Sequence, residues 1–140
     1  MISPAVSRRL LLIVAPAAAL GCADLVVKAT VATPWWAFHH RSQVWVALSV
    51  VLLLAALALA LVPSRMVALA AGVMCGGVVG NVVWARAHSD WVANPLTIGG
   101  YRQGIAFNLA DVFFLAGNLA LTAALVAVTL RNREIGRAHV

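Results

Sequence analysis

Residues 44–84, "VWVALSVVLLLAALALALVPSRMVALAAGVMCGGVVGNVVW", decide the fold of this chain. Two apolar runs, Val44–Val62 and Met66–Trp84, are separated only by a short segment that contains Pro63 and Ser64. A helix that crosses a bilayer needs about 20 apolar residues, and proline interrupts a helix. The stretch therefore predicts two membrane-spanning helices that form a tight antiparallel hairpin.

Two further runs of similar length flank this hairpin, at Leu10–Val31 and Ile105–Leu130. Of the 140 residues, 64% are hydrophobic and only 10% are charged, too few to cover the surface of a soluble domain. The sequence predicts an all-α membrane protein with a single integral-membrane domain, residues 1–140. Its four transmembrane helices lie near residues 10–31, 44–62, 66–84 and 105–130.

The arginines predict the orientation of the four helices. With four spans, both termini lie on one side, together with Arg8, Arg9, Arg65, Arg131, Arg133 and Arg137. The other side has Arg41, Arg86 and Arg102. The excess of positive charge places both termini in the cytoplasm and residues 32–43 and 85–104 in extracytoplasmic loops, which have room for short strands. The net charge of +6 thus indicates contact with membrane lipid and not with nucleic acid.

The cysteines, the tryptophans and the segment before Ala23 do not point to a catalytic site. Cys22 and Cys75 lie in apolar runs and fit neither a zinc site nor a disulfide framework, so no metal and no cofactor is predicted. Trp35, Trp36 and Trp45 are typical of interfacial anchors. The segment "ALGC" before Ala23 is compatible with a lipoprotein precursor, although the apolar run continues beyond it.

Ionisable residues inside membrane spans are functional candidates, and the predicted spans contain Asp24, Lys28 and Asp111. Asp24 and Lys28 are four residues apart and share one helical face. We expect them to form a neutralising pair near the outer end of the first helix, with Lys28 reaching toward the interface. Asp111 has no basic residue nearby on its own helix, which favours a chemical role at least as much as a structural one.

The third predicted helix contains a series of glycines and an asparagine, and the fourth contains an asparagine near Asp111. Gly72, Gly76 and Gly80 recur every four residues and predict close helix packing, within the bundle or between bundles. Asn81 follows at the outer end, where its amide can form hydrogen bonds across the bundle. Asn108 lies three residues before Asp111, so the two are expected to share a face.

Three segments carry a resemblance to signal peptidase II, the lipoprotein signal peptidase family, as a divergent member. "ADLVVKATV" on the first helix resembles the family's Asp-x-x-x-Lys segment, and "GGVVGN" on the third resembles Gly-Gly-x-x-Gly-Asn. "AFNLADV" on the fourth resembles Phe-Asn-x-Ala-Asp. The segments occur in the same order and on the same helices as in the family, and together they span most of the chain.

The resemblance implies a bacterial plasma-membrane aspartic endopeptidase that removes the signal peptide from lipid-modified prolipoproteins. Two aspartates at the outer end of the bundle would activate a water and share a proton. Asp111 corresponds to the second of these aspartates. The substrate would be a prolipoprotein signal peptide or lipopeptide, and Asn108, Asn81, Asp24 and Lys28 would form or support the site.

The position of the first catalytic aspartate departs from the family pattern. The matching register in "WVANPLTI" places Asn94 there, 17 residues before Asp111. An asparagine forms hydrogen bonds but cannot act as a base or share a proton. Asp90 is an alternative acid, 21 residues before Asp111, although its simplest interpretation is a loop acid paired with Arg86.

Two further segments of the family are altered here. Trp84 stands where the family has an aspartate after Gly-Asn, and the first outer loop has no Asn-x-Gly-Ala segment. The sequence leaves three readings open. The first is an active peptidase that uses Asp90 or an unusual geometry, and the second is a catalytically impaired paralogue that binds lipopeptide or a membrane partner. The third is an unrelated small membrane protein or lipoprotein precursor. The substrate set and the oligomeric state stay open as well.

Overall fold

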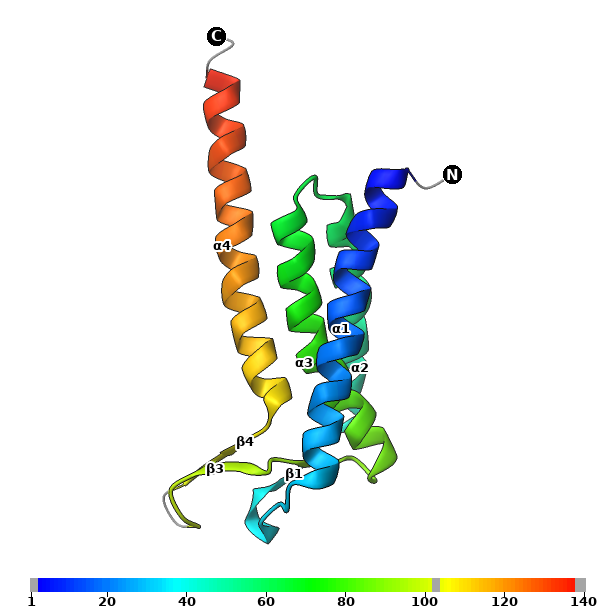
Figure 1. Cartoon of the computed structure of the whole chain (residues 1–140), viewed down its shortest axis with the longest axis vertical. Coiled ribbons are helices and arrows are strands. Elements are labelled where there is room, and N and C mark those ends of the chain that lie inside the picture. The colour runs from blue at the N-terminus through cyan, green and yellow to red at the C-terminus, as the bar shows by residue number, and fades with distance from the viewer. Residues whose placement is uncertain (1–2, 102–103, 138–140) are drawn as a thin grey trace.

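The computed structural model describes residues 3–101 and 104–137, and this part of the chain is mostly helical (Figure 1). The helices are α1 (Pro4–Thr30), α2 (Gln43–Ala58), α3 (Arg65–Ala87) and α4 (Leu109–Arg137), and a 3-10 turn, η2 (Leu59–Leu61), prolongs α2. Within the described residues, four segments are long and apolar enough to cross a membrane: Pro4–Thr30, Gln43–Leu61, Arg65–Ala87 and Leu109–Glu134. The expected helical fold with four candidate membrane spans is confirmed.

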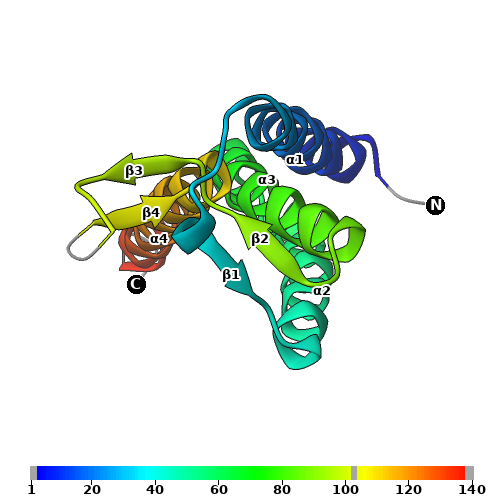
Figure 2. The same ribbon diagram turned by 90° about the horizontal axis from the view of Figure 1, so that it is seen from below.

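In the part of the chain that the structure describes, four short strands and a second 3-10 turn lie in the connections between the helices. They are η1 (Trp35–Ala37), β1 (Phe38–His40), β2 (Trp91–Ala93), β3 (Leu96–Ile98) and β4 (Ile105–Phe107). β1 pairs antiparallel with β2, and β3 pairs antiparallel with β4. All four strands gather at one end of the bundle, the strand-bearing end, whereas α1 begins and α4 ends at the other (Figures 1 and 2).

The central helix of the bundle is α3. In its most apolar stretch 67% of the residues are buried, against at most 22% in the other three candidate spans. A Cβ atom on Gly72 would lie 2.7 Å from the Leu12 carbonyl oxygen, and one on Gly76 would lie 2.7 Å from the Leu20 Cβ. Only glycine permits this approach of α1. The predicted glycine ladder therefore packs within the bundle, against α1.

The connection between α2 and α3 is as short as the sequence predicts. Ser64 caps α3, because its Oγ accepts a hydrogen bond from the Val67 amide over 3.3 Å. Arg9 on α1 donates from Nε to the carbonyl oxygen of Ala60 in η2 over 2.6 Å. This contact satisfies one of the carbonyl groups that the end of a helix leaves free.

Two helix starts differ from the expected boundaries by more than one residue. α1 begins at Pro4 instead of Leu10, because Ser3 caps it and proline suits a first helical turn. α4 begins at Leu109 instead of Ile105, because Ile105–Phe107 form strand β4 and pair with Leu96–Ile98. The apolar run in the sequence thus contains a strand, a cap and a helix.

Candidate functional site

Asp111 lies in the first turn of α4, next to the residue that caps this helix. The backbone N–H of Asp111 donates to Asn108 Oδ1 over 3.0 Å, and the backbone N–H of Asn108 donates to Asp111 Oδ2 over 3.1 Å. This reciprocal pair is a capping box, formed here by asparagine and aspartate. A negative charge at a helix N-terminus is stabilised by about 0.3–1 kcal/mol. The carboxylate within an apolar run is therefore placed where a helix best tolerates it.

Asp24 and Lys28 form a buried ion pair at the same level of the bundle. Lys28 Nζ lies 2.6 Å from Asp24 Oδ2, and both side chains are fully buried. The predicted pairing is confirmed, but the expectation that Lys28 reaches toward the interface is wrong. The ammonium group instead donates across the bundle to Asn81 Oδ1 over 2.7 Å. A buried ammonium needs such partners, because each unpaired N–H group loses its hydration.

The second oxygen of Asp24 holds the start of α4. Asp24 Oδ1 accepts a hydrogen bond from the Ala110 amide over 2.9 Å. The approach of Asp24 depends on Gly80, since a Cβ atom there would lie 3.0 Å from Asp24 Cγ. Both oxygens of this carboxylate are therefore engaged with other groups of the protein, and Asp24 acts as a structural anchor between α1, α3 and α4.

Lys28 fixes the orientation of the amides around Asp111. An ammonium group only donates, so the Asn81 atom that faces it is Oδ1, and Asn81 Nδ2 donates to Asp111 Oδ1 over 3.1 Å. Asn81 Oδ1 also accepts from Asn108 Nδ2 over 3.0 Å. Asn81 and Asn108 are both buried. The structure thus brings four residues of the predicted site, and Asp111 itself, into one hydrogen-bonded network.

Asn94 belongs to the same network. Its Oδ1 accepts from Asn108 Nδ2 over 2.5 Å, and the residue is 1% exposed. The Asn94 Nδ2 atom then faces His39 Nδ1 at 2.6 Å, which makes this ring nitrogen the acceptor. Asn108 therefore connects Asn94 to Asp111. The contact of His39 could not be predicted from the sequence, because only the pairing of β1 with β2 brings it to Asn94.

Asp90 has different partners. Its Oδ1 lies 2.8 Å from Arg86 Nη1, and its other oxygen accepts a hydrogen bond from Gln43. Ser89 and Asp90 have positive φ angles of 52° and 66°, so the chain turns sharply here before β2. The expected loop ion pair between Asp90 and Arg86 is present. The structure joins Asn94, and not Asp90, to the network around Asp111.

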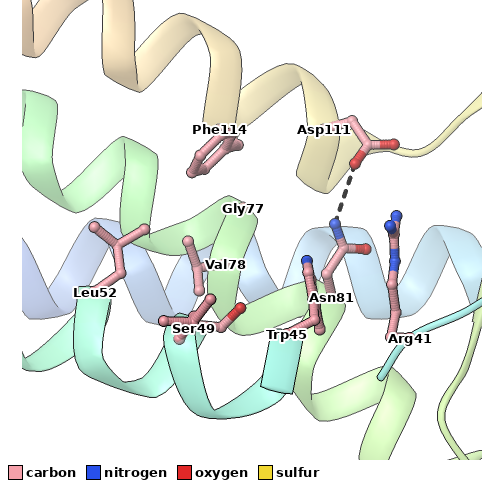
Figure 3. Close-up of a pocket in the computed structure, with 10 residues that line it drawn as sticks. Arg41, Trp45, Ser49, Leu52, Gly77, Val78, Asn81, Asp111 and Phe114 are labelled. Carbon is pink, nitrogen blue, oxygen red and sulfur yellow. Dashed lines mark hydrogen bonds between the residues drawn. The ribbon is translucent and has the colours of Figure 1, made fainter. Parts of the chain in front are cut away.

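A cavity of about 310 Å³ adjoins this network and is bounded by α2, α3 and α4 (Figure 3). We call it the α2–α4 cavity; its lining residues are Arg41, Trp45, Leu48, Ser49, Leu52, Gly77, Val78, Asn81, Asp111 and Phe114. Arg41, Asn81 and Asp111 lie at one end, and Leu52 and Phe114 lie toward the other (Figure 3). The cavity thus has a polar end and an apolar remainder.

Arg41 also lines this cavity, a position that the sequence did not predict. Its guanidinium carbon lies 5.1 Å from the centre of the Trp45 ring, within the range of a cation–π contact. Its Nε atom is buried and has no hydrogen-bond partner. Among the ion pairs of residues 3–101 and 104–137, none involves Arg41.

Fold and site together define a mostly helical chain with four candidate membrane spans and a polar network at the strand-bearing end of the bundle. Within the described residues, no group of three or more histidine, cysteine or acidic side chains is placed to hold a metal ion. Comparison of the chain with protein-family models, curated proteins and solved structures finds no match.

Proposed function

We propose that this chain is a signal peptidase II-like protein of the bacterial plasma membrane that binds the signal peptide of a lipid-modified prolipoprotein without cleaving it. The observation that carries the proposal is the composition of the α2–α4 cavity. Among the described residues that line it, Asp111 is the one carboxylate, and the asparagine joined to Asp111 through Asn108 is Asn94. The location in the bacterial plasma membrane is supported by the family resemblance and by the four candidate spans.

Peptide hydrolysis of the aspartic type needs two carboxylates, because one acts as base while the other, protonated, polarises the carbonyl group. The chain has four acidic residues. Asp24 is buried against Lys28, Asp90 is paired with Arg86, and Glu134 lies in the last part of α4. Asp111 is left with amide partners only, and an amide side chain cannot take up the proton of an attacking water.

The cavity itself suits an amphiphilic peptide. Binding pockets usually measure roughly 300–1,000 Å³ and combine an apolar lining with a few polar groups that set orientation. Here the apolar side chains of Leu48, Leu52 and Phe114 accommodate hydrocarbon, and Asn81 and Asp111 accept or donate hydrogen bonds at the polar end. With both termini in the cytoplasm, as the arginines predict, the polar end lies near the extracytoplasmic surface.

An active peptidase is the second candidate, and one observation favours it. Asp111 has no ion-pair partner among the described residues and lines a cavity large enough for a peptide segment. Hydrolysis would then require a second acid, and Asp90 would have to leave Arg86 to supply it. The binding function requires no such rearrangement.

Binding is tested with a lipidated prolipoprotein peptide that carries a photoreactive group near its lipidated cysteine. Leu48 and Leu54 both lie on α2 and are both 64% exposed, but only Leu48 lines the cavity. We expect cross-linking to be lost in Leu48→Trp, which fills the cavity, and kept in Leu54→Trp. Equal cross-linking in the two variants would show that the peptide does not occupy the cavity.

A further inference from the structure

The polar end of the α2–α4 cavity carries one positive and one negative group that are not paired with each other. Figure 3 shows the Arg41 guanidinium and the Asp111 carboxylate at the same end of the cavity, near Asn81. No ion pair between Arg41 and Asp111 occurs among the described residues. Two opposite charges that share a cavity without contact leave room for a ligand that bears the complementary charges.

Among the described residues, the Arg41 side chain has no ion-pair partner. Its Nε is buried without a hydrogen bond, while the Trp45 ring supports the guanidinium at 5.1 Å. A buried N–H group of a cation needs an acceptor, and the planar guanidinium matches the oxygens of a phosphate group especially well. A purely anionic ligand, however, would be repelled by the nearby Asp111 carboxylate. The ligand therefore needs a cation in addition to its phosphate.

The apolar part of the cavity indicates that the ligand also carries hydrocarbon chains. Leu48 and Phe114 line the cavity and are also 64% and 40% exposed, so the cavity opens sideways between α2 and α4. In a bilayer this opening faces the hydrocarbon chains of the lipid. A molecule can therefore enter from the membrane, with its polar group at Arg41 and Asp111 and its chains beside Leu48 and Leu52.

We propose that the α2–α4 cavity binds a zwitterionic phospholipid with a primary ammonium group, of the phosphatidylethanolamine class. Its phosphate accepts hydrogen bonds from Arg41, and its ammonium donates to Asp111. A choline head group lacks the ammonium N–H donors, and a glycerol head group lacks the positive charge. This lipid occupies the cavity in the absence of peptide and competes with a lipopeptide for it, but its binding does not depend on the peptide-binding function.

Native mass spectrometry of the full chain in detergent tests the proposal. The protein is mixed in turn with phosphatidylethanolamine, phosphatidylcholine, phosphatidylglycerol and diacylglycerol, all with identical acyl chains. We expect the ethanolamine lipid to bind about tenfold more tightly than the other three, because charge-assisted hydrogen bonds are among the stronger polar contacts. Equal binding of diacylglycerol, or of the choline lipid, would overturn the proposal.

Substitutions separate the two contacts. Arg41→Gln is expected to weaken binding of the ethanolamine lipid by about tenfold, as the loss of a charge-assisted contact implies. Arg86→Gln is the matched control, since Arg86 belongs to the same end of the bundle but pairs with Asp90 and does not line the cavity. Asp111→Asn should reduce the affinity for the ethanolamine lipid to the level of the choline lipid, whereas the affinity for phosphatidylglycerol should rise, because the repelling carboxylate is gone.

The variants and the peptide cross-linking test different parts of the proposals. If Arg41→Gln and Arg86→Gln have equal effects, Arg41 does not hold the phosphate and the proposal is wrong. Binding of phosphatidylglycerol by Asp111→Asn also reports that this variant is folded. Failure of peptide cross-linking together with a preserved preference for phosphatidylethanolamine would refute the peptide-binding function alone.

Discussion

Asn81 on α3 and Asp111 on α4 are joined by a hydrogen bond of 3.1 Å from the Asn81 amide to the Asp111 carboxylate. The same Asn81 side chain accepts from the buried ammonium group of Lys28 on α1. One amide therefore connects three helices at the level where α4 begins. The position of the Asp111 carboxylate in the α2–α4 cavity depends on this connection.

The buried pair of Asp24 and Lys28 is predicted to be a strong determinant of stability. Lys28→Met leaves the Asp24 carboxylate buried without its cation, which costs about 3–5 kcal/mol in comparable buried pairs. The double variant Asp24→Asn, Lys28→Met should recover part of this loss, because no unpaired charge stays buried. Unfolding in detergent micelles gives the free energy of unfolding of the unmodified chain, the two single variants and the double variant. If the losses of the two single variants simply add up in the double variant, Asp24 and Lys28 are not coupled.

Gly80 is predicted to be intolerant of even one methyl group. A Cβ atom there would lie 2.5 Å from Asp24 Oδ2, whereas a Cβ atom on Gly100 meets nothing within 4 Å. Gly80→Ala should destabilise the protein by about 1–3 kcal/mol, the usual cost of overpacking, and Gly100→Ala should have little effect. Equal thermal stability of the two variants would show that α1 does not approach α3 as described.

Asn108 is predicted to be necessary for the start of α4. Loss of an N-cap side chain costs about 0.5–2 kcal/mol, and Asn108→Ala also removes the partner of Asn81 and Asn94. Asn118→Ala is a suitable control, because Asn118 bonds only to the Phe114 carbonyl oxygen of its own helix. Amide hydrogen exchange should increase in the first turn of α4 in Asn108→Ala only. Unchanged protection there would argue against the capping box.

The helical architecture could be predicted from the sequence because hydropathy is a local property. The start of α4 could not, since Ile105–Phe107 are as apolar as the helix and become a strand only by pairing with Leu96–Ile98. The burial of Lys28 likewise depends on Asn81, a residue 53 positions away on another helix. For the same reason no local pattern indicated that Arg41 lines the cavity.

Residues Asn94 and His39 show how far the site could be predicted. The register of the sequence placed Asn94 near Asp111, and the structure joins the two through Asn108. The contact of Asn94 with His39 was not predicted. An aspartate in place of Asn94 would keep an acceptor for Asn108 and would place its other oxygen at His39 Nδ1, which donates in the tautomer that carries its proton on Nδ1. The side chains around residue 94 can therefore form hydrogen bonds with a carboxylate at this position.

We propose that this chain binds a lipid-modified prolipoprotein but lacks the second carboxylate needed to cleave it. The most direct measurement is cleavage of a lipidated prolipoprotein by the protein reconstituted in liposomes, comparing the unmodified chain, Asp111→Ala, Asn94→Asp and the double variant Asn94→Asp, Asp111→Ala. We predict no cleavage by the unmodified chain and cleavage by Asn94→Asp that disappears in the double variant. Cleavage by the unmodified chain that is abolished in Asp111→Ala would contradict the account.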